Sequence, residues 1–413
     1  MGYQQGLSGL AGASNALDVI GNNIANANTV GFKSSTAQFA DMYANSVATS
    51  VNTQIGIGSS LASVQQQFGQ GTINTTNSSL DVAINGNGFF QMSNNGVTTY
   101  SRDGTFQRDK NGFIVDAQGR NLMGYAAGSG GVINTAQTVP LQAPTTNIAP
   151  TATTKITGQF NLNSQDTVPV KTPFSATDTT TYNYSTSIQV YDSLGGSQAV
   201  NMYFVKSAAG TWEAYAGVQG GATTDLGTVT FNSSGAIQST TTGTPATPTT
   251  SLGQFQFTVP NTDGSATPQS LTLDLTGTTQ YGGKDGVNNL AQNGYASGTL
   301  TTYSIGTDGK LTGNYSNGQT AVLGLIALAN FNNPNGLVNL GGNQYAESSA
   351  SGVPQISAPG STNHGTLQGS ALENSNVDLT SQLVNLITAQ RNYQANAQTI
   401  KTQQTVDQTL INL

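Results

Sequence analysis

The side chains of this chain that could do acid–base or nucleophilic chemistry are few and widely spaced. The only histidine, His364, stands in a Gly/Ser/Thr-rich segment, and a catalytic triad would still need a serine and an acid around it. The three glutamates, Glu213, Glu347 and Glu373, are too sparse to favour the paired carboxylates of a glycosidase. No cysteine occurs, which excludes disulfides, thiol catalysis and Cys-based zinc sites. We therefore predict no enzyme activity, no cofactor and no metal.

The charge and hydrophobicity of the chain limit the classes of partner that it could bind. Only 8% of the 413 residues are charged, and the formal net charge is −7, so the sequence does not favour a nucleic-acid partner. No run approaches the roughly 18 apolar residues of a membrane helix, which predicts no membrane insertion. The N-terminus lacks the basic and apolar blocks of a cleavable signal peptide. The length predicts two to four domains.

The last stretch, residues 375–413, carries apolar residues at steps of four and three, interrupted at Gln390, Gln404 and Asp407. This heptad spacing predicts one apolar seam along a helix of roughly 55 Å. Ser375 followed by Asp378 predicts a capping box at its start. The seam consists of Leu379, Leu383, Leu386, Tyr393, Ala397, Ile400 and Ile411.

A second amphipathic helix is predicted over residues 2–27, ending at an asparagine cluster before Gly31. Its apolar positions are Leu7, Leu10, Leu17, Ile20 and Ile24. Periodicity alone leaves two interpretations open. Both helices could cover a globular core, or they could pair with each other and with copies from other subunits. In the second case we expect the ends to be disordered in the monomer and to fold on assembly.

The residues between the helices predict β structure of two styles. Phe39 lies on a short segment that could be a further helical turn, and residues 45–79 predict extended chain or a long hairpin. Residues 80–125 alternate and carry turns such as Asn95-Gly96, which predicts a β meander. The Thr-rich residues 145–293 predict a different β domain. Residues 294–372 return to the first style, with a buried strand over 321–329.

We therefore predict a mixed fold, with N- and C-terminal α-helices forming a coiled-coil-like inner domain, plus two nested, mainly antiparallel β domains. The predicted domains are a terminal helical domain (1–79 and 373–413), a discontinuous β domain (80–146 and 294–372) and an inserted outer β domain (147–293). The alternative is four domains in a row, which would not explain why the apolar seams stand at opposite ends.

Several segments resemble a known family. Residues 17–33, LDVIGNNIANANTVGFK, are similar to the N-terminal signature of bacterial flagellar axial proteins, and residues 372–379 and 389–396 are similar to their C-terminal signature. Residues 80–90 and 329–337 resemble the β domain that these proteins share. The signature positions are Asn22, Asn23, Asn26, Gly31, Phe32, Lys33, Asn376, Val377, Asp378, Leu379, Gln390, Arg391, Tyr393, Gln394, Ala395 and Asn396.

The middle of the chain resembles the hook members of this family, because rod proteins are shorter and lack a large insert. The resemblance implies a homo-polymer that forms a curved, flexible, extracellular tube and transmits motor torque from rod to filament. The implied partners are the distal rod protein, the hook cap protein, the hook–filament junction protein and the flagellar type III export apparatus, with no signal-peptide cleavage. Two alternatives stay open, a distal rod or other axial protein, and a glycan-binding β module displayed on a filament.

Overall fold

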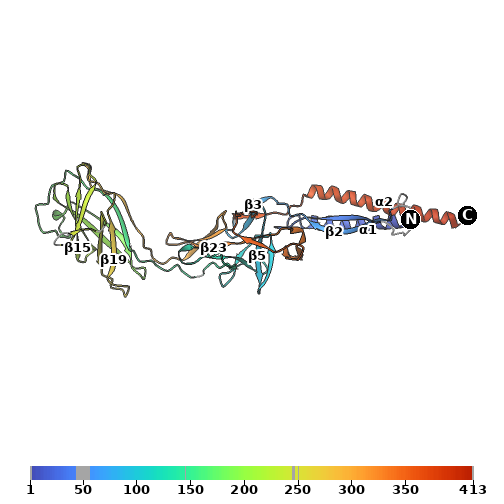
Figure 1. The fold of residues 1–413 in the computed structure, drawn as a ribbon, viewed down its shortest axis with the longest axis horizontal. Coiled ribbons are helices and arrows are strands. Elements are labelled where there is room, and N and C mark those ends of the chain that lie inside the picture. Colours follow the sequence, from blue (N-terminus) through green and yellow to red (C-terminus); the bar gives the residue numbers. More distant parts are fainter. Residues whose placement is uncertain (1, 43–55, 145, 244–246, 250, 412–413) are drawn as a thin grey trace. The chain divides into compact units, whose positions relative to one another are not determined.

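Two long helices and many short strands make up the chain (Figure 1). The computed structural model describes residues 2–42, 56–144, 146–243, 247–249 and 251–411. Unit 1 comprises Met1–Thr145, Thr301–Asn314 and Thr320–Leu413, and unit 2 comprises Thr146–Leu300 and Tyr315–Gln319. The coarse prediction of terminal helices and mainly antiparallel β structure is confirmed. No helix among the described residues is both long and apolar enough to cross a membrane.

The helices form where the sequence periodicity predicts them. Helix α1 spans Gly2–Ala25 and α2 spans Leu379–Ile411. The predicted capping box at the start of α2 is wrong. Asp378 is the N-cap instead, since its carboxylate accepts hydrogen bonds from the amides of Thr380 (2.9 Å) and Ser381 (3.1 Å). The Ser381 amide and its neighbours lower the pKa of Asp378 below its usual value.

A two-stranded hairpin follows α1. It pairs β1 (Ser35–Met42) with β2 (Gly58–Gln66), so the further helical turn predicted around Phe39 is wrong. Residues 45–55 of the predicted extended segment lie outside the described residues. The hairpin packs on α1: Gln5 Nε2 donates to Gly56 O at 2.7 Å, and a Cβ added at Gly12 would lie 3.5 Å from the Phe39 ring.

The remaining strands of unit 1 join segments that are far apart in sequence. β24 pairs with β5, β26 with β6, β23 with β9, β28 with β4 and β29 with β3. The elements are β3 (Ile73–Thr75), β4 (Val82–Asn85), β5 (Phe89–Asn94), β6 (Val97–Ser101), β7 (Gln107–Arg108), β8 (Ile114–Val115), β9 (Asn121–Ala126), η1 (Ser129–Gly131), β10 (Val139–Pro140), β21 (Leu300–Ile305), β22 (Lys310–Tyr315), β23 (Thr320–Ile326), β24 (Leu328–Asn330), η3 (Pro334–Gly336), β25 (Val338–Gly341), β26 (Gln344–Ala346), β27 (Gln355–Ser357), β28 (Thr366–Gly369) and β29 (Ala371–Glu373).

These long-range pairings correct two local predictions. The β5–β6 hairpin does turn at Asn95-Gly96, where both residues have positive φ (49° and 90°), as predicted. Residues 80–125 are nevertheless not a simple meander, because β4 pairs with β28 rather than with β5. The single strand predicted over 321–329 is divided into β23 and β24 at Ala327, and the two halves pair with different strands.

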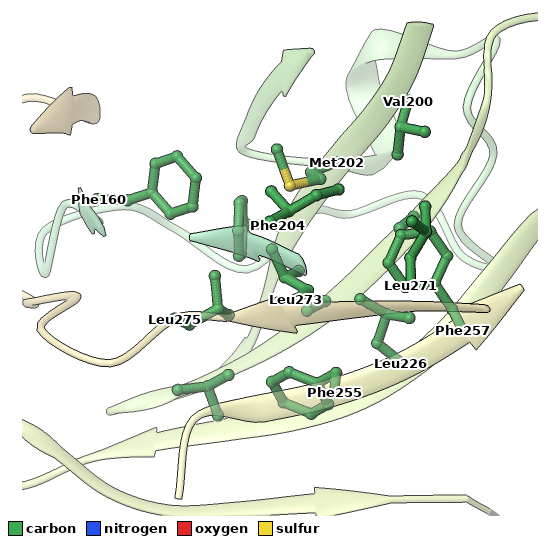
Figure 2. Packing of buried hydrophobic residues seen from close by; sticks show 14 of the residues in the cluster. Phe160, Val200, Met202, Phe204, Leu226, Phe255, Phe257, Leu271, Leu273 and Leu275 are labelled. Atoms are coloured by element: carbon green, nitrogen blue, oxygen red, sulfur yellow. The ribbon is translucent and has the colours of Figure 1, made fainter. Parts of the chain in front are cut away.

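Unit 2 is a sandwich of two sheets. One sheet has the order β12-β13-β14-β15-β16-β17, and the other has the order β18-β19-β11-β20. Apolar side chains of both sheets alternate inward and meet in one core, including Phe160, Phe204 and Leu273 (Figure 2). The elements are β11 (Lys155–Asn161), η2 (Thr179–Thr181), β12 (Tyr184–Tyr191), β13 (Ser197–Ala208), β14 (Thr211–Val218), β15 (Thr223–Phe231), β16 (Ile237–Thr242), β17 (Thr247–Pro248), β18 (Gln254–Val259), β19 (Gln269–Asp274) and β20 (Gly286–Gln292).

Candidate functional site: the terminal helices and their polar junction

The two terminal helices lie side by side within unit 1 (Figure 1). Glycines of α1 face α2 at close range. A Cβ added at Gly9 would come within 2.6 Å of the Asn396 side chain, and one added at Gly6 within 2.9 Å of Ile400. The missing side chains therefore allow the two helix backbones to approach closely.

The predicted seam residues do not all lie in this contact. Gln382 and Asn396 of α2 touch α1, each one residue before a predicted seam position, and Ala389 is buried. Of the predicted seam residues, Ile400 does lie against Gly6 of α1. Half-buried seam residues are Leu10, Leu17, Ile20, Ile24, Leu386, Ala397 and Ile400. Exposed seam residues are Leu7, Leu379, Leu383, Tyr393 and Ile411. A role of any of these residues in joining copies of the chain stays a prediction.

Gly31 of the N-terminal signature lies where the chain leaves α1 and meets the β structure. Its φ is +70°, a conformation that other residues rarely adopt, and its amide donates to Glu373 O at 2.8 Å. A Cβ at this position would lie 2.6 Å from Asp103 N and 2.7 Å from the carbonyl carbon of Arg102. Only glycine fits this position without moving the backbone.

Beside Gly31, three charged side chains are buried together, which we call the junction cluster: Lys33, Arg102 and Glu373. Lys33 Nζ lies 2.7 Å from Glu373 Oε1, and Arg102 Nη1 lies 3.2 Å from Glu373 Oε2. Glu373 Oε1 also accepts from the Gly71 amide at 2.8 Å. Lys33 donates further to Gly69 O at 2.8 Å. The cluster therefore ties the segment after α1 and the segment between β2 and β3 to the carboxylate of Glu373, which lies at the end of β29 shortly before α2.

Burial sets the electrostatics of the junction cluster. It lowers the pKa of Lys33, the charge of Arg102 lowers it further, and Glu373 opposes both effects. Burial likewise lowers the pKa of Arg102, again against the attraction of Glu373. Two cations therefore depend on one carboxylate for compensation in a site from which water is excluded, and removing that carboxylate would leave both uncompensated.

Two signature asparagines bridge the same segments. Asn376 Oδ1 accepts from Ser34 N at 2.7 Å, while its Nδ2 donates to Gln67 O at 2.7 Å and Gly69 O at 3.1 Å. Asn23 is almost fully buried and holds both backbone groups of Ser35, each at 2.8 Å. Each amide side chain thus supplies a hydrogen-bond partner for backbone groups at the start of β1.

The other signature residues are placed less centrally. Asn26 donates to Asn22 O at 3.0 Å at the end of α1, Phe32 and Val377 are half-buried, and Asp378 caps α2. The remaining α2 signature positions are exposed: Gln390, Arg391, Gln394 and Ala395. The structure therefore brings Gly31, Lys33 and Asn376 into one site and leaves most α2 positions on the surface.

Sequence reasoning missed Arg102 and Gly71. Arg102 is 3% exposed, donates to Gly86 O at 2.8 Å and lies over the Phe89 ring at 5.4 Å. Its partner Glu373 is 271 residues away, so no local pattern marks it. The one available signal was scarcity, because a chain with only 12 Lys and Arg has few cations to place.

The residues considered for catalysis are not assembled into a catalytic site. His364 is half-buried, and each ring nitrogen lies 2.9 Å from a backbone carbonyl. Glu213 accepts from Tyr215 at 2.9 Å in unit 2, and Glu347 accepts from Tyr100 at 3.3 Å in unit 1. Within the described part of the chain, no three His, Asp or Glu side chains are grouped to hold a metal ion.

Comparison with protein-family models matches four segments. Residues 4–33 match the "Flagella basal body rod protein" model, and residues 83–158 match the "Flagellar hook protein FlgE/F/G D1 domain". Residues 161–295 match the "Flagellar basal body protein FlaE D2 domain". Residues 368–413 match the "Flagellar basal body rod FlgEFG protein C-terminal" model. The matched segments thus include nearly all of both helices and all three residues of the junction cluster.

Three relatives that match this chain over nearly its whole length have the same description. The chain is 44% identical to the flagellar hook protein FlgE of Salmonella typhimurium, and the match covers 100% of both chains. It is 42% identical to the flagellar hook protein FlgE of Escherichia coli, again over 100% of both. The protein of the same description from Treponema pallidum is 31% identical, with 99% of this chain and 98% of the relative covered.

Proposed function

Because the chain belongs to the flagellar hook protein family, it is a structural subunit of the bacterial flagellar hook and not an enzyme, and we propose that exposed faces of its terminal helices join copies of it into the tube. The tube would be curved and flexible, and would transmit motor torque from rod to filament. The observation that carries the proposal is apolar surface on α2 that no other described residue of the subunit covers.

Four exposed apolar side chains lie in the first turns of α2, and others lie toward its end. Leu379, Leu383, Val384 and Ile387 are 45–58% exposed, and Leu7 of α1 is 52% exposed. Burying the exposed half of five such side chains would contribute on the order of 5 kcal/mol per subunit. That free energy is available only when another copy covers them. It supports a coiled-coil-like inner domain completed between subunits, and helical ends that become fully ordered on assembly.

We infer three domains in the assembled subunit. The terminal helical domain comprises 1–79 and 373–413, the discontinuous β domain 80–146 and 294–372, and the inserted outer domain 147–293. Two observations support this nesting. Strands of the second domain pair across the insertion, as β24 does with β5, and the core of unit 2 is built from residues within 147–293.

We also propose how the subunit reaches its place and what it meets there. The flagellar type III export apparatus would export it without signal-peptide cleavage, and the hook cap protein would direct its polymerisation outside the cell. The first copies would bind the distal rod protein, and the last would bind the hook–filament junction protein. The absence of cysteine supports export as an unfolded chain, because no disulfide has to be avoided or remade.

The assembly proposal is tested with Leu383→Gln combined with Ile387→Gln. We expect few or no hooks on purified basal bodies in electron micrographs, and soluble subunit in the medium, because both changes make the exposed face polar. The matched control is Val170→Gln, which alters a 99% exposed valine in unit 2 and should leave hooks normal. Normal hooks in the double variant would refute the proposal.

Location separates the hook from the alternative axial position. Gold-labelled antibody against residues 147–293 should mark only the short curved segment between rod and filament on sheared flagella. Label on the rod would instead identify a distal rod or other axial protein.

A further inference from the structure

One end of the unit 2 sandwich contains a cavity that the assembly proposal does not use. It lies where the loops after β11, β13, β15 and β19 come together, and its volume is about 490 Å³. Cavities of this size hold small organic ligands. Its lining includes Lys206, Ser233, Ser234, Gln280 and Tyr281.

Lys206 is the reason to expect an anion in this cavity. The residue is 6% exposed, its Nζ donates to Ser164 O at 2.6 Å, and it lies 5.7 Å from the Trp212 ring centroid. Within the part of the chain that the structure describes, no carboxylate lies within ion-pair distance of this ammonium. Lysine is rarely buried without a counter-charge. An ammonium has three N–H donors, so a bound carboxylate could accept from it.

The backbone around Lys206 holds the side chain in place. Its amide donates to Asn183 Oδ1 at 2.8 Å, and the residue is directly opposite Trp212 in the β13–β14 register. The facing turn is also fixed, because Asn232 Oδ1 accepts from the Ser234 and Ala236 amides at 2.9 and 3.0 Å. The ammonium therefore stands at a preformed cavity rather than on a flexible surface side chain.

The rest of the lining suits a polyhydroxylated ligand. Ser233, Ser234 and Gln280 offer hydroxyl and amide groups, and Tyr281 offers a 55% exposed aromatic ring. Hydroxyls and amides can pair with sugar hydroxyls, and an aromatic face can cover the apolar face of a sugar ring. We propose that this cavity binds an acidic monosaccharide of the hexuronic acid class, whose carboxylate pairs with Lys206. The hook would then carry a glycan-binding site in addition to its structural role.

The chain contains its own reporter for this binding. Trp212 is the only tryptophan and lies beside Lys206, so neutralising the ammonium should change its emission. The full-length subunit is titrated with sodium glucuronate at constant ionic strength, and saturation-transfer NMR on the same sample detects the bound sugar independently. We expect a saturable change with glucuronate, none with glucose, and a much weaker response to acetate.

Three variants decide the outcome. Lys206→Met should weaken glucuronate binding roughly tenfold or more, because a charge-assisted hydrogen bond is lost. Tyr281→Ala, at an exposed position, should also weaken binding and decides the question if Lys206→Met fails to fold. Lys171→Met, which changes an exposed cation of the same unit, should bind like the parent. Absence of glucuronate binding by both methods, equal binding of acetate, or full affinity in folded Lys206→Met would each overturn the proposal.

Discussion

Replacing Glu373 by glutamine tests whether the junction cluster holds unit 1 together. The change keeps the size of the side chain but removes the one carboxylate among the described residues that pairs with Lys33 at 2.7 Å and Arg102 at 3.2 Å. All three side chains are at most 3% exposed, so water cannot replace the lost charge. Breaking a buried ion pair by removing one partner costs about 3–5 kcal/mol. The Gly71 amide can still donate to the glutamine oxygen, so we expect about 4 kcal/mol.

Urea unfolding of the full-length chain can separate the two units. Both helices belong to unit 1 and dominate far-UV circular dichroism at 222 nm, whereas Trp212 lies in the core of unit 2 and reports that unit by fluorescence. With a slope near 3 kcal/mol per molar urea, the loss should lower the circular-dichroism midpoint by about 1.3 M. The Trp212 transition should not move.

Two further variants control for nonspecific effects. Asp308→Asn breaks the Asp308–Lys310 pair, whose side chains are about half exposed, and should cost less than about 1 kcal/mol. Adding Lys33→Met to Glu373→Gln removes one uncompensated cation and should restore part of the stability. The reasoning is refuted if Glu373→Gln shifts the midpoint no more than Asp308→Asn does, or if the double variant is less stable than Glu373→Gln alone.

Three other changes test the close contacts around the helices. Gly9→Val should destabilise the helix pair by about 1–3 kcal/mol and speed hydrogen exchange in α2. The control Gly21→Val, where no atom lies within 4 Å of the added Cβ, should do neither. Equal effects of the two variants would contradict the close contact at Gly9. The ionised carboxylate of Asp378 caps α2, so its stabilisation is fully present above the unfolded pKa of about 4 and is lost as pH falls through the lower folded pKa. Amide hydrogen exchange at the start of α2 should therefore speed up at acid pH, and less so in Asp378→Asn. Gly71→Ala would place a Cβ 2.0 Å from Asn374 O and should cost about 1–3 kcal/mol in urea unfolding, whereas Gly69→Ala should be near neutral.

The helices could be predicted from sequence, but not the face by which they pair. Steps of four and three give two neighbouring stripes on α2, one through Leu383 and Ala397 and one through Gln382 and Asn396. The apolar stripe was the natural prediction because burial favours it. The structure places Asn396 of the polar stripe against Gly9, which leaves room for its side chain, while Ile400 of the apolar stripe still packs against Gly6. That choice depends on the shape of the partner surface, which periodicity does not contain.

In the β structure, likewise, turns could be predicted from neighbouring residues, but the pairing of distant strands could not. Asn95-Gly96 marks its hairpin because the turn chemistry is local. The pairing of β4 with β28, and of Arg102 with Glu373, depends on contacts across more than 250 residues. The family signature identified Lys33 and Gly31 but gave no reason for them. The reason is steric for Gly31 and electrostatic for Lys33, and both become visible only when the distant segments meet.

The junction cluster stands out in a chain that otherwise avoids charge. A buried ion pair adds little stability relative to apolar residues of the same volume, but it is satisfied in very few geometries. Glu373 accepts from Lys33, Arg102 and the Gly71 amide at once, so a shift of any one segment breaks a charge-assisted hydrogen bond. Apolar packing of the same segments would tolerate sliding. We infer that charges are placed here to fix the angle at which the terminal helices leave the β structure, which the proposed transmission of torque would require the subunit to keep under load.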